Sequence, residues 1–344
     1  MNTSKKLLSY RYSKSFPLNK YKHKKNYLRK KIFATKCHDV CPVCGGENAD
    51  LIAEVDRSGF ICDTVICQQC HFVFNDTFIS NPEDIYLKDY AIKLWSNPEE
   101  SFKRRTNFDS FAWKRMAFVI SKLGDDFDNI SSIFELGCGD GCNLLPYHLI
   151  GKQASGCDFN EDFLKPGIEK GLNLIGGEIQ NIPKDKVFDL ILLIHTFGHV
   201  IDLDETVRSV SNRLSKDGLV YVEVPGVLGW NSESINRKES MGLKSSNNFF
   251  NYLQFEINYY FDLVHLKEIW ERNGFELIEG DEWCRAIFRK KFSNEDAINR
   301  TINTDKFTNN VYLYLTKVEK DFLNLKNLFY GFSRVVMRKI RRFI

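Results

Sequence analysis

The chain has 344 residues, of which 43% are hydrophobic and 27% charged, so it is long enough for about two domains and apolar enough to bury a core. Its longest stretches without Asp, Glu, Lys or Arg, Thr64–Asn75 and Leu190–Ile201, have 12 residues each. Crossing a bilayer takes about 20 apolar residues, so this length excludes an integral membrane protein. No N-terminal stretch joins an apolar run to a small-residue cleavage site, so we expect a cytoplasmic rather than a secreted protein.

The formal net charge of +3 hides an uneven distribution. Residues 1–36 carry 12 Lys or Arg and no acid, residues 322–344 carry 6 and no acid, and the part between them has an excess of 15 acids. The first segment has no helical or strand period and repels itself, which predicts a disordered or loosely ordered arm over residues 1–36. We therefore expect an acidic folded body with basic ends.

Six of the ten cysteines fall in the segment 37–70, and four of them form two CxxC pairs. In a reducing compartment this spacing indicates metal binding rather than a disulfide. Two such pairs complete a tetrahedral site of four thiolates, which is typical of structural zinc, and this predicts a zinc ribbon over residues 37–80. Buried free cysteines are the alternative. The predicted ligands are Cys41, Cys44, Cys67 and Cys70, with Cys37, His38, Cys62 and His71 as nearby substitutes.

Residues 81–123 are expected to be a helical linker, because an apolar stripe predicts a helix near 101–123. Over 124–295, the apolar runs SIFELG, ASGCDF, LNLIGGE, FDLILLI and LVYVEV alternate with helical segments that hold CNLLPYHLI, EDFLKPGIEK and LDETVRSVSNRLS. Runs this apolar favour strands buried on both faces, and the alternation implies a parallel sheet. The predicted fold is an α/β, Rossmann-like sheet with helices on both faces, preceded by the small zinc ribbon.

The last third of the chain begins with a polar and aromatic segment, residues 226–262, which we interpret as a substrate lid. A helix containing LVHLKEIWERNG and two strand-like runs, FELIEG and CRAIFRK, then close the domain. Residues 296–344 are predicted to be a helical, basic C-terminal extension.

A glycine-rich turn follows the first apolar run of this domain and opens a helix. In ELGCGDG, which starts at Glu135, the three glycines let the backbone turn sharply and let a ligand approach the main chain. The helix N-terminus beyond them offers free N–H groups to a carboxylate or phosphate. Asp158 ends the next strand, where an acid can accept hydrogen bonds from ribose hydroxyls. The GxGxG spacing differs from the GxGxxG dinucleotide fingerprint.

In combination, ELGCGDG, GCDFN, FDLILLIHTFGHV and RLSKDGLVYVEVP resemble successive motifs of class I S-adenosylmethionine-dependent methyltransferases, over roughly residues 100–290. The resemblance implies that the glycine loop takes the methionine part of S-adenosylmethionine, that Asp158 takes the ribose, and that GEIQNIP lines the adenine. The cofactor residues implied in this way are Glu135, Gly137, Cys138, Gly139, Gly141, Asp158, Phe159, Glu178 and Ile179.

With CPVCGG and CQQC in front, the chain is similar to methyltransferases that carry an N-terminal zinc ribbon. These include C-methyltransferases of nucleotide-linked deoxysugars and relatives associated with surface-polysaccharide synthesis. The segment DIYLKDYA resembles the tyrosine-containing segment of such proteins, which implies that Tyr90 closes over the cofactor. An ordinary packing role for Tyr90 is the alternative.

Methyl transfer depends mainly on positioning, and a general base helps when the acceptor is a hydroxyl or a carbon acid. His199 is our first candidate for a base or a substrate contact and His195 the second, although either can instead cap the strand end. The acids with which some relatives bind a divalent metal are absent, since His195 and Gly198 stand at those positions. The lid residues that suit a sugar, or a merely packed lid, are Trp230, Asn247, Asn248, Tyr252, Glu256, Asn258, Tyr259 and Tyr260.

The basic ends have three interpretations: a solvated tail with a packed C-terminal helix, a helix that contacts the inner membrane surface, and a nucleic-acid contact. The acidic body argues against an RNA substrate. We predict methyl transfer from S-adenosylmethionine to a sugar, a nucleotide sugar, a glycan precursor or a similar polar small molecule. The alternatives are an RNA methyltransferase or RNA-binding protein, and a domain that binds the cofactor without catalysis. The membrane interpretation rests on Arg334, Arg338, Arg341 and Arg342.

Overall fold

The computed structural model of this protein describes most of the chain between residues 35 and 291, together with a short N-terminal strand and a C-terminal helix. Tyr90, Trp230, Asn247, Asn248 and the basic residues from Arg334 to Arg342 lie outside the described residues. The described residues are 2–6, 35–56, 61–79, 98–229, 249, 252–291, 307 and 309–323.

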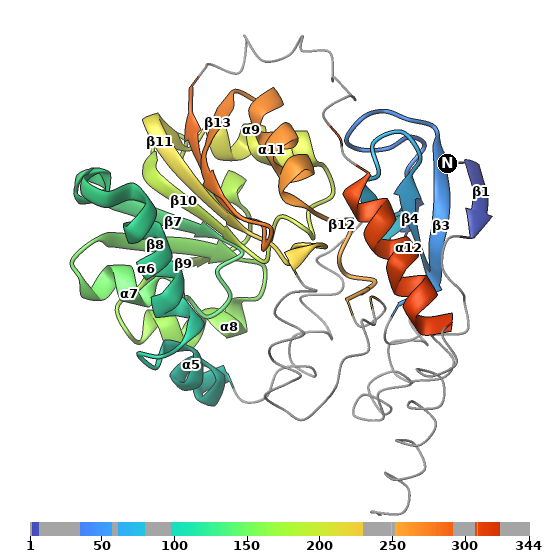
Figure 1. Ribbon diagram of the computed structural model, residues 1–344. Helices are drawn as coiled ribbons and strands as arrows, with labels where there is room; N and C mark the ends of the chain where they lie inside the picture. Colours follow the sequence, from blue (N-terminus) through green and yellow to red (C-terminus); the bar gives the residue numbers. More distant parts are fainter. Residues whose placement is uncertain are drawn as a thin grey trace, which may run out of the picture.

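A seven-stranded sheet forms the larger part of the structure (Figure 1). Its strand order is β13-β14-β11-β10-β7-β8-β9, and the five strands from β11 to β9 are parallel. Strands β14 and β13 add an antiparallel hairpin at one edge. All five predicted apolar runs form strands of the parallel part. The bounds are β7 Ser132–Leu136, β8 Gln153–Asp158, β9 Asn173–Gly176, β10 Phe188–Ile194, β11 Leu214–Glu223, β13 Phe275–Gly280 and β14 Arg285–Lys290.

Helices cover both faces of this sheet, which confirms the predicted fold class. Alternate residues of β10 point to opposite faces: Leu190 packs in a core with helices α6, α7 and α8, and Ile191 in a core with α9 and α11. No helix in the described part of the chain is long and apolar enough to cross a membrane. The bounds are α5 Pro98–Thr106, α6 Phe111–Leu123, η3 Gly124–Asn129, α7 Leu145–Leu149, α8 Glu161–Ile168, η4 Ile179–Asn181, α9 Leu203–Ser211, α11 Leu263–Arg272 and α12 Asn310–Leu323.

Two predicted helices differ from the structure at their ends. The single helix expected near 101–123 is two helices, α5 and α6, because the backbone becomes extended at Ser110, where ψ is 168°. Trp113 donates a hydrogen bond from its indole to the Thr106 carbonyl at 3.1 Å and so fixes the turn between them. The helix expected over LDETVRSVSNRLS ends at Ser211, since Leu214 already pairs with β10.

The cysteine-rich part forms a second, five-stranded sheet of order β1-β3-β4-β5-β12. Its last strand, β12, comes from the predicted lid and not from the cysteine-rich segment. The expected disordered arm over residues 1–36 is wrong for residues 2–6, which form β1 along the edge of β3, because backbone pairing there is independent of side-chain charge. Residues 7–34 lie outside the described residues. The bounds of this sheet are β1 Asn2–Lys6, β3 Asn48–Val55, β4 Ile61–Cys67, β5 Val73–Asn75 and β12 Tyr259–Tyr260. Strands β2 Thr35–Cys37 and β6 Thr77–Ile79 pair with each other in a separate two-stranded sheet.

The two sheets share one hydrophobic core and are not separate domains joined only by a linker. Phe261 is fully buried and packs against Phe72 of the cysteine-rich part and Phe197 of the larger sheet, with ring centroids 5.4 Å apart in both pairs. Helix α12, within the predicted C-terminal extension, buries Val311 and Leu315 in a third cluster with residues of β3, β4, β5 and β12, and lies over this sheet in Figure 1. The cysteine-rich part is therefore packed from both sides.

Candidate active site

The glycine loop between β7 and α7 is the centre of the site. Gly137, Gly139 and Gly141 all have positive φ, at 71°, 54° and 75°. A Cβ at Gly137 would lie 2.5 Å from the Thr196 hydroxyl, so that position also has no room for a side chain. At Gly139 no heavy atom lies within 4 Å of such a Cβ, so the backbone is open to a ligand there.

Asp158 at the end of β8 is tied directly to this loop. Its carboxylate accepts the Gly139 N–H at 2.8 Å through one oxygen and the Asn160 N–H at 2.9 Å through the other. Burial raises the pKa of Asp158, against the lowering effect of these two backbone hydrogen bonds. The pairing ties the end of β8 to the loop that follows β7.

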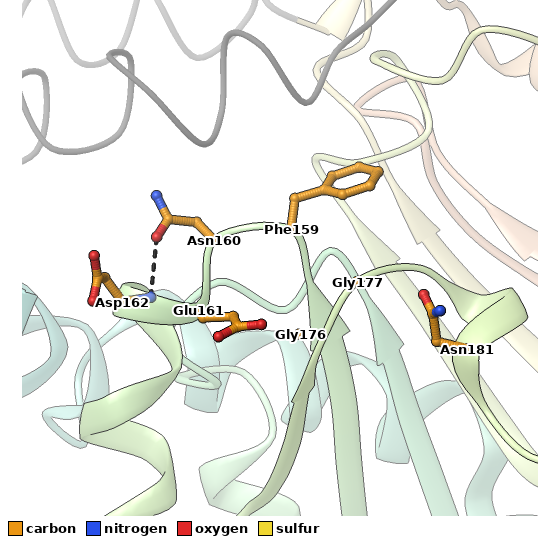
Figure 2. Close-up of a pocket in the computed structure, with 7 residues that line it drawn as sticks. All are labelled: Phe159, Asn160, Glu161, Asp162, Gly176, Gly177 and Asn181. Atoms are coloured by element: carbon orange, nitrogen blue, oxygen red, sulfur yellow. Dashed lines mark hydrogen bonds between the residues drawn. The ribbon is translucent and has the colours of Figure 1, made fainter.

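A pocket of about 440 Å³ opens beside Asp158, at the carboxyl ends of β8 and β9 (Figure 2). Phe159 lies in its wall, whereas Glu178 is exposed next to it at the start of η4. The side chain of Ile179 points into the main core and is 4% exposed. The lining residues are Phe159, Asn160, Glu161, Asp162, Gly176, Gly177 and Asn181.

Beneath the loop, Glu135 is completely buried. It accepts a hydrogen bond from the Asn143 amide at 2.7 Å, and burial raises its pKa to about 8. Its second carboxylate oxygen has no hydrogen-bond partner among the described residues. The side chain of Cys138 belongs to the core below, so what Cys138 offers to the loop is its backbone, which donates to the Cys157 carbonyl at 2.9 Å.

A buried ion pair, which the sequence analysis missed, holds His195 at the end of β10. Arg115 of α6 donates to both Glu223 oxygens through Nε at 3.0 Å and to one of them through Nη2 at 2.6 Å. Arg115 Nη2 also lies 2.9 Å from His195 Nε2. Burial alone raises the pKa of Glu223, but the neighbouring His195 and Arg115 hold it well below its usual range.

His195 Nε2 faces two groups: the Arg115 guanidinium at 2.9 Å, which can only donate, and a Glu223 carboxylate oxygen at 3.3 Å, which can only accept. When Nε2 accepts from Arg115, the proton of the neutral ring is on Nδ1. His195 has a φ of 57°, a conformation that costs free energy in a residue with a side chain, and its side chain is 48% exposed. The site therefore presents an exposed imidazole at this position. Glu223 had a sequence signal, as the acid that ends a strand in VYVEV; Arg115 had none.

His199 lies four residues further on and is partly buried. Its Nδ1 donates to the Glu256 carbonyl at 2.6 Å, so the lone pair of the neutral ring is on Nε2. Burial lowers the pKa of His199 to about 4, although the hydrogen bond to Glu256 raises it. The two histidines are therefore held differently: His199 by its Nδ1 on a backbone carbonyl, and His195 by its Nε2 beside the ion pair.

The aromatic residues of the predicted lid that the structure describes are packed inside and do not line a cleft. Tyr259 donates its hydroxyl to the Ile201 carbonyl at 2.5 Å, and Tyr260 to the Gln254 carbonyl at 2.9 Å. Tyr252 donates to the Pro225 carbonyl. These phenols are satisfied by the backbone, so these three tyrosines follow the packed-lid alternative and not the substrate-contact one.

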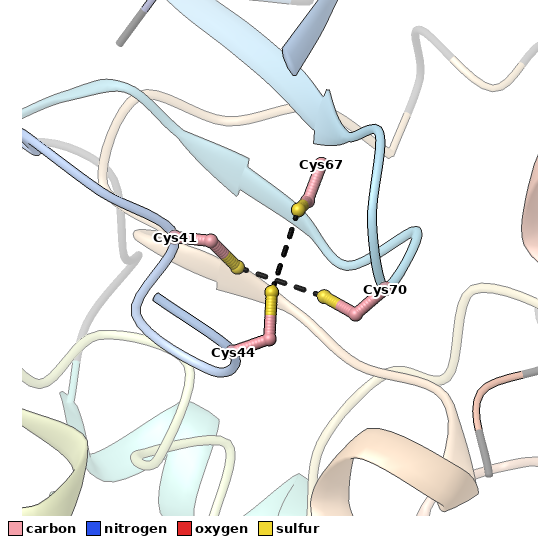
Figure 3. Close-up of side chains that lie close together, drawn as sticks. All are labelled: Cys41, Cys44, Cys67 and Cys70. Carbon is pink, nitrogen blue, oxygen red and sulfur yellow. Dashed lines mark hydrogen bonds between the residues drawn. The ribbon is translucent and has the colours of Figure 1, made fainter. Parts of the chain in front are cut away.

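The four predicted cysteines come together in one cluster (Figure 3). All four sulfur atoms lie within 4.8 Å of one another, and the pairs Cys41–Cys70 and Cys44–Cys67 are 3.6 Å apart. Sulfur atoms in a tetrahedral zinc site are about 3.8 Å apart, as Zn–S bonds of about 2.3 Å require. The thiol of Cys41 lowers the pKa of Cys44 and Cys67 by hydrogen bonding to their sulfurs. The donor set and its spacing therefore fit a tetrahedral thiolate metal site.

The backbone of the two CxxC turns fits the same site. Gly45 has a φ of 75°, and its N–H donates to the Cys41 carbonyl at 2.9 Å. A Cβ on Gly46 would lie 3.3 Å from the sulfurs of both Cys44 and Cys67, so only glycine leaves the cluster its space. Of the substitute ligands, Cys37 lies outside the cluster and contacts the Thr77 hydroxyl at 3.7 Å.

A mostly parallel sheet with helices on both faces and a glycine loop after its first strand defines an α/β protein of the nucleotide-binding type. The sequence matches the family described as Methyltransferase domain over residues 108–279, which is half of the chain. The chain belongs to this family and is a class I S-adenosylmethionine-dependent methyltransferase, as its motifs indicated.

Among solved structures, an S-adenosylmethionine-dependent methyltransferase from Clostridium acetobutylicum is similar at 13% identity and a TM-score of 0.41, over 57% of this chain and 100% of that one. The magnesium protoporphyrin IX methyltransferase from Synechocystis is 14% identical, with a TM-score of 0.38, over 61% and 98%. An amino pentose methyltransferase from Micromonospora echinaspora is 17% identical, with a TM-score of 0.32, over 38% of this chain and only 57% of its own. A comparison with curated proteins gives no match.

The low pKa of His199 predicts a pH dependence of stability. Between pH 6.5, the usual value, and about 4, the unfolded chain binds a proton that the folded one does not, so stability falls as the pH is lowered. His199→Gln should lose about 1–2 kcal/mol less than the wild type between pH 7 and pH 5. Urea unfolding at both pH values measures this, and an equal loss in both proteins contradicts the assignment.

Proposed function

We propose that this methyltransferase binds S-adenosylmethionine across the glycine loop and the pocket beside Asp158, and transfers its methyl group to a polar small molecule. The observation that carries the proposal is the link from the Gly139 N–H to the Asp158 carboxylate at the carboxyl edge of the sheet. Ligands of open α/β sheets bind at this edge. In this proposal, the pocket that Phe159 lines takes the adenine end, and the methionine part lies over the glycine loop above Glu135.

The two histidines supply complementary groups for the acceptor. Bound S-adenosylmethionine would provide a methyl group on a sulfonium, which an acceptor atom attacks in line. His199 is neutral at pH 7 and would take the acceptor's proton on Nε2. His195, which Arg115 and Glu223 hold in place, would donate from Nδ1 to an oxygen of the same acceptor. Orientation by these groups contributes most of the rate.

The acceptor we propose is a sugar, a nucleotide sugar, a glycan precursor or a similar polar metabolite. An exposed imidazole next to an ion pair suits a hydroxyl- or carbonyl-bearing molecule. The resemblance to ribbon-bearing sugar methyltransferases supports the same class. A cluster of thiols needs a reducing compartment, which supports a cytoplasmic location.

Cofactor binding is tested with S-adenosylhomocysteine and calorimetry. Asp158→Ala should lower its affinity about tenfold or more, because the ribose hydroxyls and the loop lose their shared acceptor. Asp189→Ala is the matched control. Asp189 also accepts two backbone N–H groups, from Ser131 and Ser132, but it lies near the start of β10, at the end of the parallel strands opposite the glycine loop. Equal affinity in Asp158→Ala and the wild type would refute the proposed cofactor site.

The acceptor class is tested by incubating the full chain and tritiated S-adenosylmethionine with fractionated cell material. We expect label in nucleotide sugars or glycan intermediates, and none with His199→Gln. Label in RNA would overturn the proposed acceptor class and favour the nucleic-acid alternative. Cofactor binding without label in any fraction would show a domain that no longer transfers methyl groups.

We also infer that the four-cysteine cluster holds one structural zinc ion, since thiolates fill every coordination position. Metal analysis should find about one zinc per chain. Cys44→Ser should reduce this content and the thermal stability. Cys142→Ser, which changes a buried cysteine outside the cluster, should keep the zinc. A visible iron–sulfur absorbance would overturn the zinc assignment.

A further inference from the structure

Two buried asparagines connect the four-cysteine unit to the loop that carries His199. Asn75 ends β5 of the cysteine-rich sheet, and Asn258 directly precedes β12. Both side chains are buried, Asn75 completely and Asn258 to 5% exposure. Asn75 contacts the segment 254–258, which directly precedes β12, the strand that pairs with β5 of the cysteine-rich sheet.

In the cysteine-rich sheet, Asn75 makes hydrogen bonds through its backbone and through both polar atoms of its side chain. Its N–H donates to the Asn258 carbonyl at 2.9 Å, and its amide donates to the Ile257 carbonyl at 2.6 Å and the Gln254 carbonyl at 3.2 Å. Its side-chain oxygen accepts from the buried Thr64 hydroxyl at 2.7 Å on β4. The position of segment 254–258 thus follows that of β4 and β5.

On the other side, the same segment holds the histidine loop. The Asn258 and Tyr259 N–H groups both donate to the Gly198 carbonyl, at 2.8 and 3.1 Å. The Asn258 amide donates to the carbonyls of His199 at 3.2 Å and Val200 at 2.9 Å. His199 completes the contact with its own bond to the Glu256 carbonyl. The backbone and ring of His199 are therefore fixed by the segment that Asn75 holds.

The cysteine turns themselves are fastened to α11. His265 donates from Nε2 to the Cys70 carbonyl at 2.8 Å, in the second turn. Arg272, at the other end of the helix, donates to the carbonyls of Pro42 and Val43 at 3.2 and 2.6 Å, in the first turn. These hydrogen bonds fix both CxxC turns against α11. They can form only while each turn keeps its folded conformation.

We propose that the metal-bound four-cysteine unit is a positioning element of the active site, and that Asn75 and Asn258 transmit its geometry to His199. The inference rests on the role proposed above for His199. The glycine loop is held mainly by Cys157 and Asp158 of the larger sheet, and it also contacts Thr196, which precedes His199 in the histidine loop. Loss of the metal should therefore disturb the acceptor half of the site and spare the cofactor half.

The experiment compares the zinc-loaded full chain, the same chain after zinc removal by a chelator under reducing conditions, and Asn258→Ala. Asn273→Ala is the matched control: Asn273 is also buried, and its amide also makes two hydrogen bonds, to Asp204 at 2.6 Å and the Ile269 carbonyl at 2.8 Å, away from His199. The readouts are zinc content, amide hydrogen exchange by NMR, the protonation of the His199 ring by ¹⁵N NMR, and calorimetry with S-adenosylhomocysteine.

Without zinc and in Asn258→Ala, we expect amide exchange at His199 and Tyr259 to accelerate at least tenfold, and the His199 ring to lose its single Nδ1-protonated form. Exchange at Gly137 and Gly141, and the affinity for S-adenosylhomocysteine, should change less than twofold. Asn273→Ala should resemble the wild type in the His199 signals. Unchanged exchange and ring signals at His199 in Asn258→Ala, or equal acceleration in the glycine loop, would overturn the proposal.

The outcomes separate this proposal from the proposed function. If the zinc-loaded wild type fails to bind S-adenosylhomocysteine, the cofactor assignment fails, while the exchange data still decide whether the ribbon positions His199. If zinc removal unfolds the whole chain, as far-UV circular dichroism would reveal, Asn258→Ala carries the decision, because it leaves all four cysteines in place.

Discussion

The site depends on one constraint of the sheet: parallel strands joined by crossover helices all end at the same edge. The glycine loop follows β7, Asp158 ends β8, His195 follows β10 and Glu223 ends β11. The sheet itself therefore brings groups that are far apart in the chain to this edge, without direct contacts between them. Direct bonds then refine the arrangement, such as the Gly139 N–H on Asp158 and the Arg115 guanidinium between Glu223 and His195.

The second organising feature is a core shared by two sheets. Phe72, Phe197 and Phe261 are fully buried where the sheets meet, so separating them would expose aromatic surface on both sides. Strand β12 strengthens the contact between the two sheets. It pairs with β5 of the cysteine-rich sheet, while the chain that contains it belongs to the methyltransferase domain. A unit of this size has little core of its own, and this packing, together with the thiolate cluster, compensates for that.

Sequence patterns predicted the strands well because each run was continuously apolar, and predicted the cysteine cluster because CxxC spacing is a local property. They could not predict Arg115, since an amphipathic stripe says which side of a helix is buried but not which strand end it meets. They left Tyr259 and Tyr260 open between a substrate contact and a packed lid, because both can share one composition. They also misjudged residues 2–6, whose charges said nothing about backbone pairing.

By itself, the sequence determined the family, the parallel order of strands and helices, the glycines that need positive φ, and the four thiols. These features depend on residue type and on short spacing, so they can be recognised in the sequence without knowledge of long-range contacts. Only the tertiary structure decided which groups hold the rings of His195 and His199, and that a segment of the predicted lid completes the cysteine-rich sheet. The physical reason is that proton placement and strand pairing depend on partners up to about 180 residues away, which only folding brings within hydrogen-bond distance.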